Sequence, residues 1–290
     1  MIYDCFSFFN ELDVLELRLN ILSPVVDKFV LVESHLTHSN KPKELFFAKN
    51  VERFGAFADK IIHVVVEKFP DNPNNDAWVF EHFQRNAIMR ALVDVEPDDI
   101  ILISDVDEIP RPESIKEMVA DDHVYLFRQR MYYYYINCID TSKQKSNASW
   151  IGTIGLRRDL LEEPQKLRQL GLLLTGLTDS RLIVRSYFKC VKFFIADLRG
   201  YSLKFIDDAG WHFSFLGGAL RIIAKLEAFA HQEYNKAEFK NPDKIKSMIA
   251  NGEDIFGRGF TYAFVPLDSS YPNYLLTHKE AYSEFIHASA

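Results

Sequence analysis

Apolar segments with strand-like and helix-like spacing alternate along the first hundred residues. Three segments rich in β-branched and aromatic side chains predict strands, at residues 2–9, 28–34 and 60–66. Leucines at helical spacing predict a helix over Leu12–Leu22, and a second helix-like segment covers residues 76–93. This order of strands and helices is typical of an α/β fold with a mostly parallel sheet flanked by helices on both faces.

The most informative stretch is residues 98–110, where a strand pattern is followed directly by carboxylates. Four consecutive apolar residues are typical of a strand covered on both faces, and Pro110 ends it. Asp105, Asp107 and Glu108 therefore lie at the C-terminal end of a strand, where open α/β sheets bind ligands. Three carboxylates without an intervening Lys or Arg repel one another, and a bound divalent cation relieves that repulsion. The pattern predicts a metal-dependent enzyme that acts on a nucleotide-type substrate.

The pattern is less regular after residue 120. Residues 123–136 are a long run of strand formers, and helical spacing returns near residues 160–170 and over residues 219–234. The final forty residues read as an irregular, aromatic-rich segment. No repeat or linker divides the chain, so we expect a single domain over residues 1–290.

Composition narrows the classes of partner. The chain has 290 residues, 48% hydrophobic and 26% charged, which is ordinary for a globular protein. A net charge of −7 argues against nucleic acid as the main partner, because phosphate backbones favour basic surfaces. No apolar run of about 18 residues is present, and the N-terminus lacks a signal-peptide pattern. We therefore expect a cytoplasmic or otherwise soluble protein without a transmembrane segment.

The predicted cation could serve more than one chemistry. In glycosyl transfer from a nucleotide sugar it neutralises the departing diphosphate, whereas in nucleotidyl or phosphoryl transfer it contacts the phosphorus under attack. No Walker-type phosphate loop or kinase signature is present, and Ile109 stands where phosphatases with an aspartate nucleophile usually have threonine. Two alternatives stay open: a sugar nucleotidyltransferase, although residues 1–20 lack the usual phosphate loop, and a non-catalytic sugar-binding protein of the same fold.

Further short motifs accompany residues 98–110 in a fixed order: Val30-Leu31-Val32-Glu33-Ser34, Phe69-Pro70, Asp76-Ala77-Trp78, Arg85, Leu156-Arg157-Arg158, Ala209-Gly210-Trp211-His212 and Tyr274-Leu275-Leu276. Together they resemble glycosyltransferase family 17. The resemblance implies a GT-A fold, UDP-GlcNAc as the donor, a Mn²⁺ or Mg²⁺ ion, inversion at the anomeric carbon, and a glycan or polysaccharide acceptor. We then expect a nucleotide-sugar-binding half over residues 1–120 and an acceptor-side half over residues 121–290, which forms a C-terminal extension.

The resemblance also assigns a metal site. Asp105 and Asp107 match the family's Asp-x-Asp motif, with Asp107 as the direct ligand and Asp105 nearer the ribose or a metal-bound water. His212 lies in the Gly-Trp-His segment and is expected to complete the metal shell, since an imidazole suits Mn²⁺ better than Mg²⁺. A structural role for His212 between Trp211 and Phe213 is the alternative.

The expected donor site involves the first two strands. Glu33 ends the second strand, where the resemblance implies an acid that holds uracil or ribose; a helix cap or a surface ion pair is the alternative. Phe6 and Asn10 bound the loop after the first strand and are expected to contact the donor beside Glu33.

Two arginines are candidates for the diphosphate, and three acids for the catalytic base. Arg85 could bind phosphate through its fork of donors, with an ion pair to Glu81 as the alternative, and Arg157 is a second candidate. Inverting transfer needs a carboxylate that removes the proton of the acceptor hydroxyl. The candidates for that base are Glu108, Asp207 and Asp208.

Overall fold

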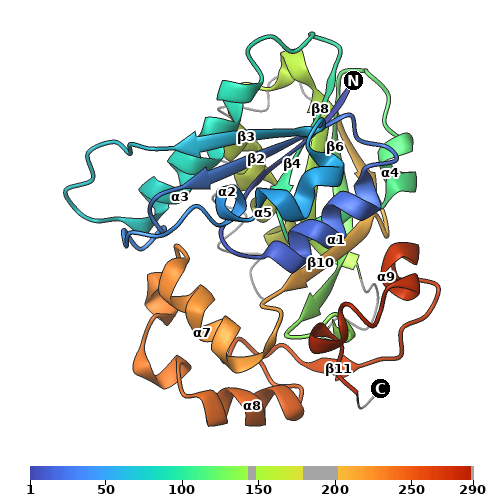
Figure 1. Ribbon diagram of the computed structural model, residues 1–290. Coiled ribbons are helices and arrows are strands. Elements are labelled where there is room, and N and C mark those ends of the chain that lie inside the picture. Colours follow the sequence, from blue (N-terminus) through green and yellow to red (C-terminus); the bar gives the residue numbers. More distant parts are fainter. Residues whose placement is uncertain (143–147, 179–201, 289–290) are drawn as a thin grey trace.

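The computed structural model of the protein describes residues 1–142, 148–178 and 202–288 (Figure 1). Eleven strands of the described chain form one sheet, with the main order β11-β7-β6-β8-β4-β1-β2-β3 and with β5, β9 and β10 paired off this path. The strands are β1 (Ile2–Ser7), β2 (Lys28–Ser34), β3 (Ile61–Val66), β4 (Ile100–Asp105), β5 (Glu108–Pro110), β6 (His123–Tyr133), β7 (Cys138–Asp140), β8 (Ala148–Arg157), β9 (Ser202–Ile206), β10 (Gly210–Ser214) and β11 (Tyr262–Phe264).

Helices and 3₁₀ turns connect these strands. The α-helices are α1 (Leu12–Leu22), α2 (Phe46–Lys49), α3 (Ala77–Asn86), α4 (Pro112–Lys116), α5 (Pro164–Thr178), α7 (Gly218–Ala228), α8 (Pro242–Ala250) and α9 (Asn273–Thr277). The 3₁₀ helices are η1 (Val51–Phe57), η2 (Ala87–Ala91), η3 (Arg158–Leu160), η4 (Gln232–Tyr234), η5 (Ala237–Phe239) and η6 (Ser283–Phe285). In the part of the chain that the structure describes, no helix has the length and apolar run needed to cross a membrane.

The first four strands form the parallel part of the sheet. β1 pairs with β2 on one side and with β4 on the other, and β2 pairs with β3, all in parallel. Each parallel pair requires a crossover, and α1, α2 with η1, and α3 with η2 supply these connections. The predicted α/β class, with helices on both faces, is confirmed.

The second half of the sheet is mixed, with parallel and antiparallel strand pairs. β8 runs antiparallel to both β4 and β6, whereas β9 and β10 run parallel to β6. β5 and β11 add further antiparallel pairs, to β10 and β7. Antiparallel neighbours need no crossover helix between them. An apolar run in the sequence therefore predicts a strand but not the direction in which it pairs.

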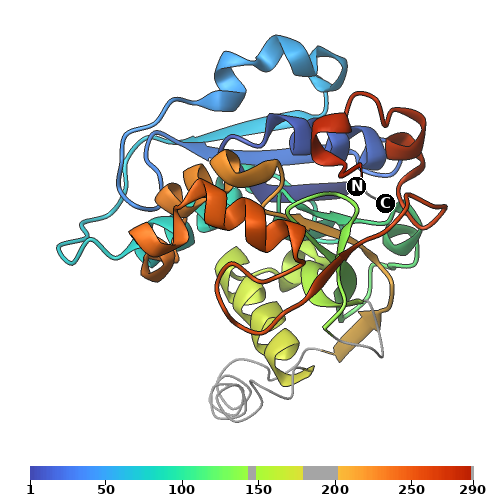
Figure 2. The same ribbon diagram turned by 90° about the horizontal axis from the view of Figure 1, so that it is seen from below.

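The sheet is buried on both faces. Alternate residues of one strand join different cores: Val30 packs into one hydrophobic cluster and Leu31 into the other. The helices α1 and α9 cover one face, and α3 and α5 cover the opposite face (Figure 2). The apolar runs of β2 and β4 follow from this two-sided burial.

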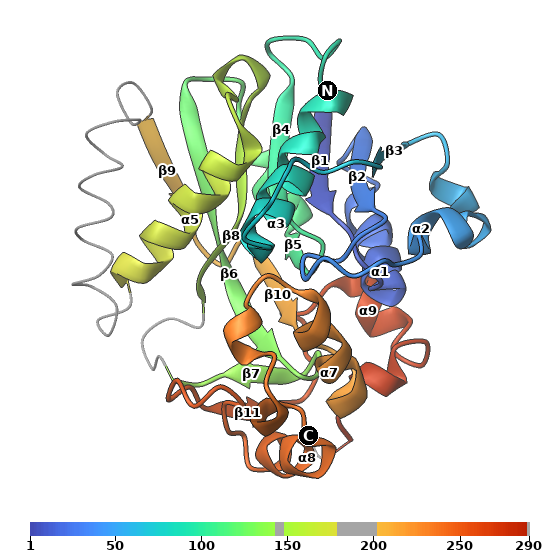
Figure 3. The ribbon, with the colours of Figure 1, turned by 90° about the vertical axis from the view of Figure 1, so that its left-hand side faces the viewer.

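A third hydrophobic cluster lies at the end of the sheet. Ile222 and Leu226 of α7 pack with Ile245 and Ile249 of α8, and Tyr134 at the end of β6 joins them. Figure 3 shows α7 and α8 beyond the lower ends of β6 and β10, on the side toward which β10 points. This cluster places α7 next to the C-terminal ends of the central strands.

Candidate active site

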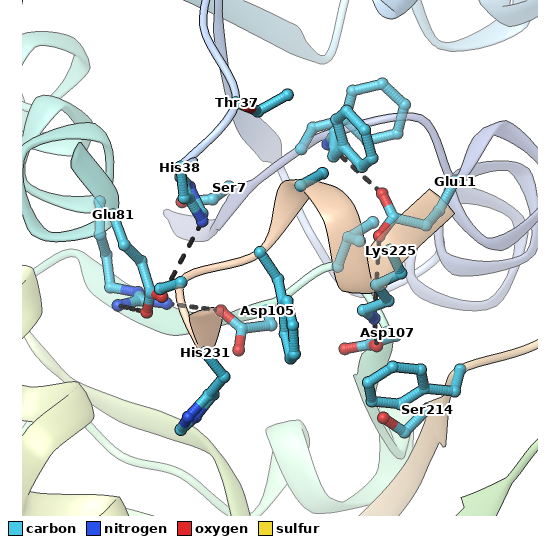
Figure 4. A pocket seen from close by; sticks show the side chains of 18 of the residues that line it. Ser7, Glu11, Thr37, His38, Glu81, Asp105, Asp107, Ser214, Lys225 and His231 are labelled. Atoms are coloured by element: carbon cyan, nitrogen blue, oxygen red, sulfur yellow. Dashed lines mark hydrogen bonds and ion pairs between the residues drawn. The ribbon is translucent and has the colours of Figure 1, made fainter. Parts of the chain in front are cut away.

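A cavity of about 360 Å³ opens at the C-terminal ends of the central strands (Figure 4). Its walls include the last residues of three strands, Ser7 of β1, Asp105 of β4 and Ser214 of β10. Residues of α3, α5 and α7 also line it, as do Trp150, Tyr133, Phe229 and His231. The volume is in the range of small-molecule sites, and its position is that of ligand sites in α/β sheets.

Residues 105–108, here called the acidic loop, are held by one buried arginine. Arg18 of α1 donates from Nη1 to the backbone oxygens of Asp105 at 3.1 Å, Val106 at 3.2 Å and Glu108 at 2.8 Å. Its Nε and Nη2 donate to the carboxylate of Asp4 on β1, at 2.7 and 2.6 Å. Arg18 is fully buried, so it fixes the acidic loop to the first strand and helix.

Asp105 accepts one arginine on each carboxylate oxygen. Arg85 of α3 donates from Nη2 to Oδ1 at 2.9 Å, and Arg168 of α5 donates from Nη2 to Oδ2 at 2.7 Å. Burial acts to raise the pKa of Asp105, but Arg168 and Arg85 outweigh it and hold that pKa well below the ordinary value. Asp105 is therefore ionised and paired. Arg85 also donates to Glu81 at 3.0 Å, so the alternative ion pair is present as well.

Asp107 faces a lysine and a histidine. Lys225 of α7 donates to Oδ2 at 2.9 Å, and Nε2 of His212 lies 3.5 Å from Oδ1. Burial raises the pKa of Asp107, but Lys225 and His212 outweigh it and keep that pKa far below the ordinary value. The His212 ring packs against Trp150 at 5.0 Å between centroids, and its Nδ1 is buried without a hydrogen-bond partner among the described residues.

Glu108 lies beneath the cavity and does not line it. Its Oε1 accepts from Nε1 of Trp150 at 2.6 Å and from Arg168 at 2.7 Å, and its Oε2 accepts from the backbone N–H of Asp105 at 2.8 Å. The side chain is fully buried. Both carboxylate oxygens are engaged by the acidic loop and its neighbours, and the side chain does not reach the cavity wall.

The chemistry of the side chains at Asp107 fits a divalent cation that is shared with a substrate. A carboxylate oxygen and an imidazole nitrogen face each other at 3.5 Å, and a second imidazole nitrogen is unpartnered. Asp105 is less suited, because each of its oxygens already accepts from an arginine. Among the described residues, no group of three or more His, Cys, Asp or Glu side chains could hold a metal by itself. Two protein ligands are sufficient where substrate phosphates and water complete the coordination.

The structure does not bring Glu33, Phe6 or Asn10 to the cavity wall. The carboxylate of Glu33 is fully buried and accepts from the backbone N–H of Phe47 at 3.0 Å, so it binds the first turn of α2, as in the helix-cap alternative. Phe6 is buried beneath the guanidinium of Arg18, at 4.6 Å from ring centroid to Cζ. Asn10 is exposed, and its neighbours Phe9 and Glu11 line the cavity instead.

Three further predicted residues lie away from the cavity, which corrects their expected positions. Arg157 pairs with Ile100 at the start of β4, at the opposite end of that strand from Asp105, and binds Asp159 at 2.6 Å. Asp207 is 75% exposed and pairs with Arg128, while Asp208 binds Arg130 at 2.6 Å and also pairs with Arg111. Both aspartates lie in the turn before β10. The cavity is at the other end of this strand, at Ser214.

The structure brings Arg85, Asp105, Asp107 and His212 together, and it adds charged residues that sequence reasoning missed. The additional charged or titratable residues on the cavity wall are Glu11, His38, Lys43, Glu81, Arg168, Lys225, His231 and Arg258. The sequence indicates Glu81 only as a partner of Arg85. No motif marks Lys225, which lies 118 residues from Asp107 in the sequence, so only the fold could reveal their contact.

Comparison with known proteins identifies the class as glycosyltransferase. The chain belongs to glycosyltransferase family 17, whose family model matches residues 1–204. Human β-1,4-mannosyl-glycoprotein 4-β-N-acetylglucosaminyltransferase is 30% identical over 112 residues, which cover 37% of this chain and 21% of the human protein. The rat protein of the same name gives the same identity and coverage. The match therefore spans about a fifth of the length of these relatives.

Solved structures give a more remote similarity. Glucosyl-3-phosphoglycerate synthase from Mycobacterium tuberculosis is 14% identical, with 73% of this chain and 70% of that chain covered and a TM-score of 0.34. A mannosyltransferase from Pyrobaculum calidifontis, solved with GDP-Man and Mn²⁺, is 15% identical, with 72% and 55% covered and a TM-score of 0.39. Scores at this level do not bear on donor or metal.

Proposed function

We propose that the protein is an inverting, metal-dependent glycosyltransferase that moves GlcNAc from UDP-GlcNAc to a hydroxyl of a glycan or polysaccharide acceptor. Membership of glycosyltransferase family 17 supports the reaction class. The name of the human relative, an N-acetylglucosaminyltransferase, supports GlcNAc as the transferred sugar. Mn²⁺ or Mg²⁺ is the proposed ion, and the mixed carboxylate and imidazole pair favours Mn²⁺.

The observation that carries this proposal is the position of Asp107 beside His212 on a cavity that is also lined by cationic side chains. Nε2 of His212 and Oδ1 of Asp107 lie 3.5 Å apart, and Arg85, Arg168 and Lys225 line the same space. A nucleoside diphosphate leaving group carries several negative charges, so it needs both a divalent cation and protein cations around it.

Each residue of the site then has a defined task. Asp107 and His212 hold the ion, which supplies Lewis-acid stabilisation of the departing diphosphate when bound. Arg85 and Arg168 fix the orientation of Asp105 toward the donor. Glu108 and Arg18 hold the backbone of the acidic loop, so these positions are set before substrate arrives.

The catalytic base has to be a carboxylate that can reach the acceptor hydroxyl. Four carboxylates among the described residues line the cavity, at Glu11, Glu81, Asp105 and Asp107. With the two aspartates assigned to the ion and the donor, we assign the base to Glu11 or Glu81. Loss of the base lowers kcat and leaves KM for the donor nearly unchanged, so Glu11→Gln and Glu81→Gln identify it. A normal kcat in both variants would exclude this assignment.

The test of the proposed function is release of UDP from UDP-GlcNAc in the presence of Mn²⁺. Asp107→Asn and His212→Asn are expected to lower the rate at least about 100-fold, because each removes a ligand of the ion that stabilises the leaving group. Asp243→Asn, at a 94% exposed position on α8, is the matched control and keeps the wild-type rate. A wild-type rate in Asp107→Asn would show that the metal assignment is wrong.

A further inference from the structure

Lys225 is a cation from a distant helix that is bound to the acidic loop. It lies on α7, and its Nζ is 2.9 Å from Oδ2 of Asp107 and 3.9 Å from Oε1 of Glu11. The ammonium also lies 5.1 Å from the ring centroid of Phe215. Figure 4 shows Lys225 between the two carboxylates, on the wall of the cavity. No sequence motif or family assignment gives this residue a role.

The contacts of Lys225 conflict with a divalent cation at Asp107. The lysine occupies one carboxylate oxygen while His212 faces the other. An ion bound at Asp107, whose side chain is 7% exposed, would lie within a few ångströms of the lysine ammonium, and two cations at that distance repel each other. The ion therefore binds well only if the ammonium moves away. The flexible four-carbon stem of lysine permits such a move without displacement of α7.

The charges around the cavity indicate where the ammonium would go. Among the described lining residues there are five cationic side chains, Lys43, Arg85, Arg168, Lys225 and Arg258, and four carboxylates, Glu11, Glu81, Asp105 and Asp107. The wall is thus nearly balanced without any ligand. A divalent cation alone adds unbalanced positive charge, whereas the cation together with a diphosphate leaves the balance nearly unchanged. The diphosphate would also give the ammonium a new anionic partner.

We propose that Lys225 is a tethered counter-cation that neutralises Asp107 until a divalent cation and a nucleoside diphosphate arrive together, and then moves to the diphosphate. The inference rests on the proposed function and adds a consequence to it. The ion and the nucleotide bind cooperatively, because each offsets the charge that the other introduces. An ion without nucleotide competes with Lys225 for Asp107.

Binding of Mn²⁺, measured by electron paramagnetic resonance without turnover, tests this inference. Wild-type protein is expected to bind Mn²⁺ weakly alone and about tenfold or more tightly with UDP. Lys225→Met is expected to bind Mn²⁺ alone about tenfold more tightly than the wild type, and to gain less from UDP. Arg221→Met is the matched control, because Arg221 is a 49% exposed cation on the same helix that does not line the cavity. Lys225→Gln provides the same comparison if Lys225→Met does not fold.

The outcomes separate the inference from the proposed function. If wild-type protein binds Mn²⁺ with UDP, and Lys225→Met binds Mn²⁺ alone no more tightly than Arg221→Met, Lys225 does not compete with the ion and the inference is wrong. The proposed function then stands. If wild-type protein binds neither Mn²⁺ nor UDP, the proposed function fails and the inference fails with it.

Discussion

Arg18 is the side chain on which the position of the acidic loop depends. It is fully buried, and it joins the carboxylate of Asp4 to three backbone oxygens of the loop. When one member of a buried ion pair is removed, the remaining charge is not reached by water and stays unpaired. This costs a large part of the free energy of folding. The loop geometry is thus set by two residues that are buried and do not line the cavity.

We expect Arg18→Met to lower the free energy of unfolding by about 3–5 kcal/mol, because it leaves the buried Asp4 carboxylate without its partner. Urea unfolding followed by circular dichroism measures this loss. The control is Arg53→Met, which removes a 36% exposed arginine paired with Asp13 and Glu16 and is expected to cost at most about 1 kcal/mol. Equal losses in the two variants would contradict the role of Arg18.

We expect His38 to make the free energy of unfolding depend on pH. Burial lowers its pKa below the ordinary value, and the nearby Glu81 opposes this only in part. The unfolded chain therefore takes up a proton near pH ~6.5 that the folded protein takes up only at lower pH. The stabilisation that neutral His38 provides is therefore fully present above that pH. It is lost as the pH falls toward the pKa of His38 in the folded protein.

We therefore expect the free energy of unfolding to decrease between about pH 7.5 and pH 5.5, and to decrease less in His38→Gln. Unfolding by urea at a series of pH values gives both slopes. His82, whose pKa is also lowered by burial, contributes in the same direction and remains in the variant. Parallel slopes in the two proteins would show that His38 does not contribute.

A residue of the site could be predicted from the sequence only where its place in a strand already determines where its side chain lies. Asp105 and Asp107 follow a strongly apolar strand, so their place at the sheet edge follows from the pattern. Glu33 also ends a strand, but its side chain turns to α2, a choice that depends on a segment fourteen residues away. Asp207 and Asp208 directly precede the Ala209-Gly210-Trp211-His212 motif, yet they lie at the end of β10 that is remote from the cavity.

At the scale of elements, the pairing of β5 with β10 brings the acidic loop and His212, which form the proposed metal site, next to each other. Glu108 pairs with His212, and Gly210 pairs with Pro110, in antiparallel register. Gly210 has φ of +150°, and a Cβ there would lie 2.3 Å from the backbone oxygen of Ile109. Only glycine permits this close approach.

Gly210→Ala is therefore expected to destabilise the protein by about 1–3 kcal/mol, because the strands must separate to accommodate the methyl group. Thermal or urea unfolding measures the change. Gly55→Ala, where a Cβ meets nothing within 4 Å, is the control and is expected to change stability by no more than about 0.5 kcal/mol. Similar effects of the two substitutions would contradict the close contact between β5 and β10.

Elements with strong periodicity were predictable, and those defined by tertiary contacts were not. β1, β2 and β4 coincide with apolar runs, since these strands are covered on both faces. β3 also coincides with an apolar run, although it is a partly buried strand at the edge of the sheet. The helix expected near residues 160–170 is found at Pro164–Thr178, with the proline as its first residue. No helix was predicted at Pro242–Ala250, although Asn241 caps it and Pro242 opens it, both recognisable start signals.

At the scale of the whole molecule, the cavity is built from both halves of the chain. Strands of the first half supply Ser7 and Asp105, and β10 and α7 of the second half supply His212 and Lys225. The third hydrophobic cluster fixes α7 at the end of the sheet and so keeps Lys225 within reach of the acidic loop. A reaction at this site would use groups that are more than a hundred residues apart in the sequence.

The central claim is that the cavity binds a UDP-sugar together with a divalent cation, and calorimetry with a panel of nucleotide sugars tests it most directly. UDP-GlcNAc is expected to bind in the presence of Mn²⁺, with an affinity at least about tenfold lower when the ion is removed by EDTA. GDP- and dTDP-sugars serve as controls for the base and are expected to bind more weakly. Binding of UDP-GlcNAc that is equally tight without any divalent ion, or no binding of any nucleotide sugar with Mn²⁺ present, would contradict the account.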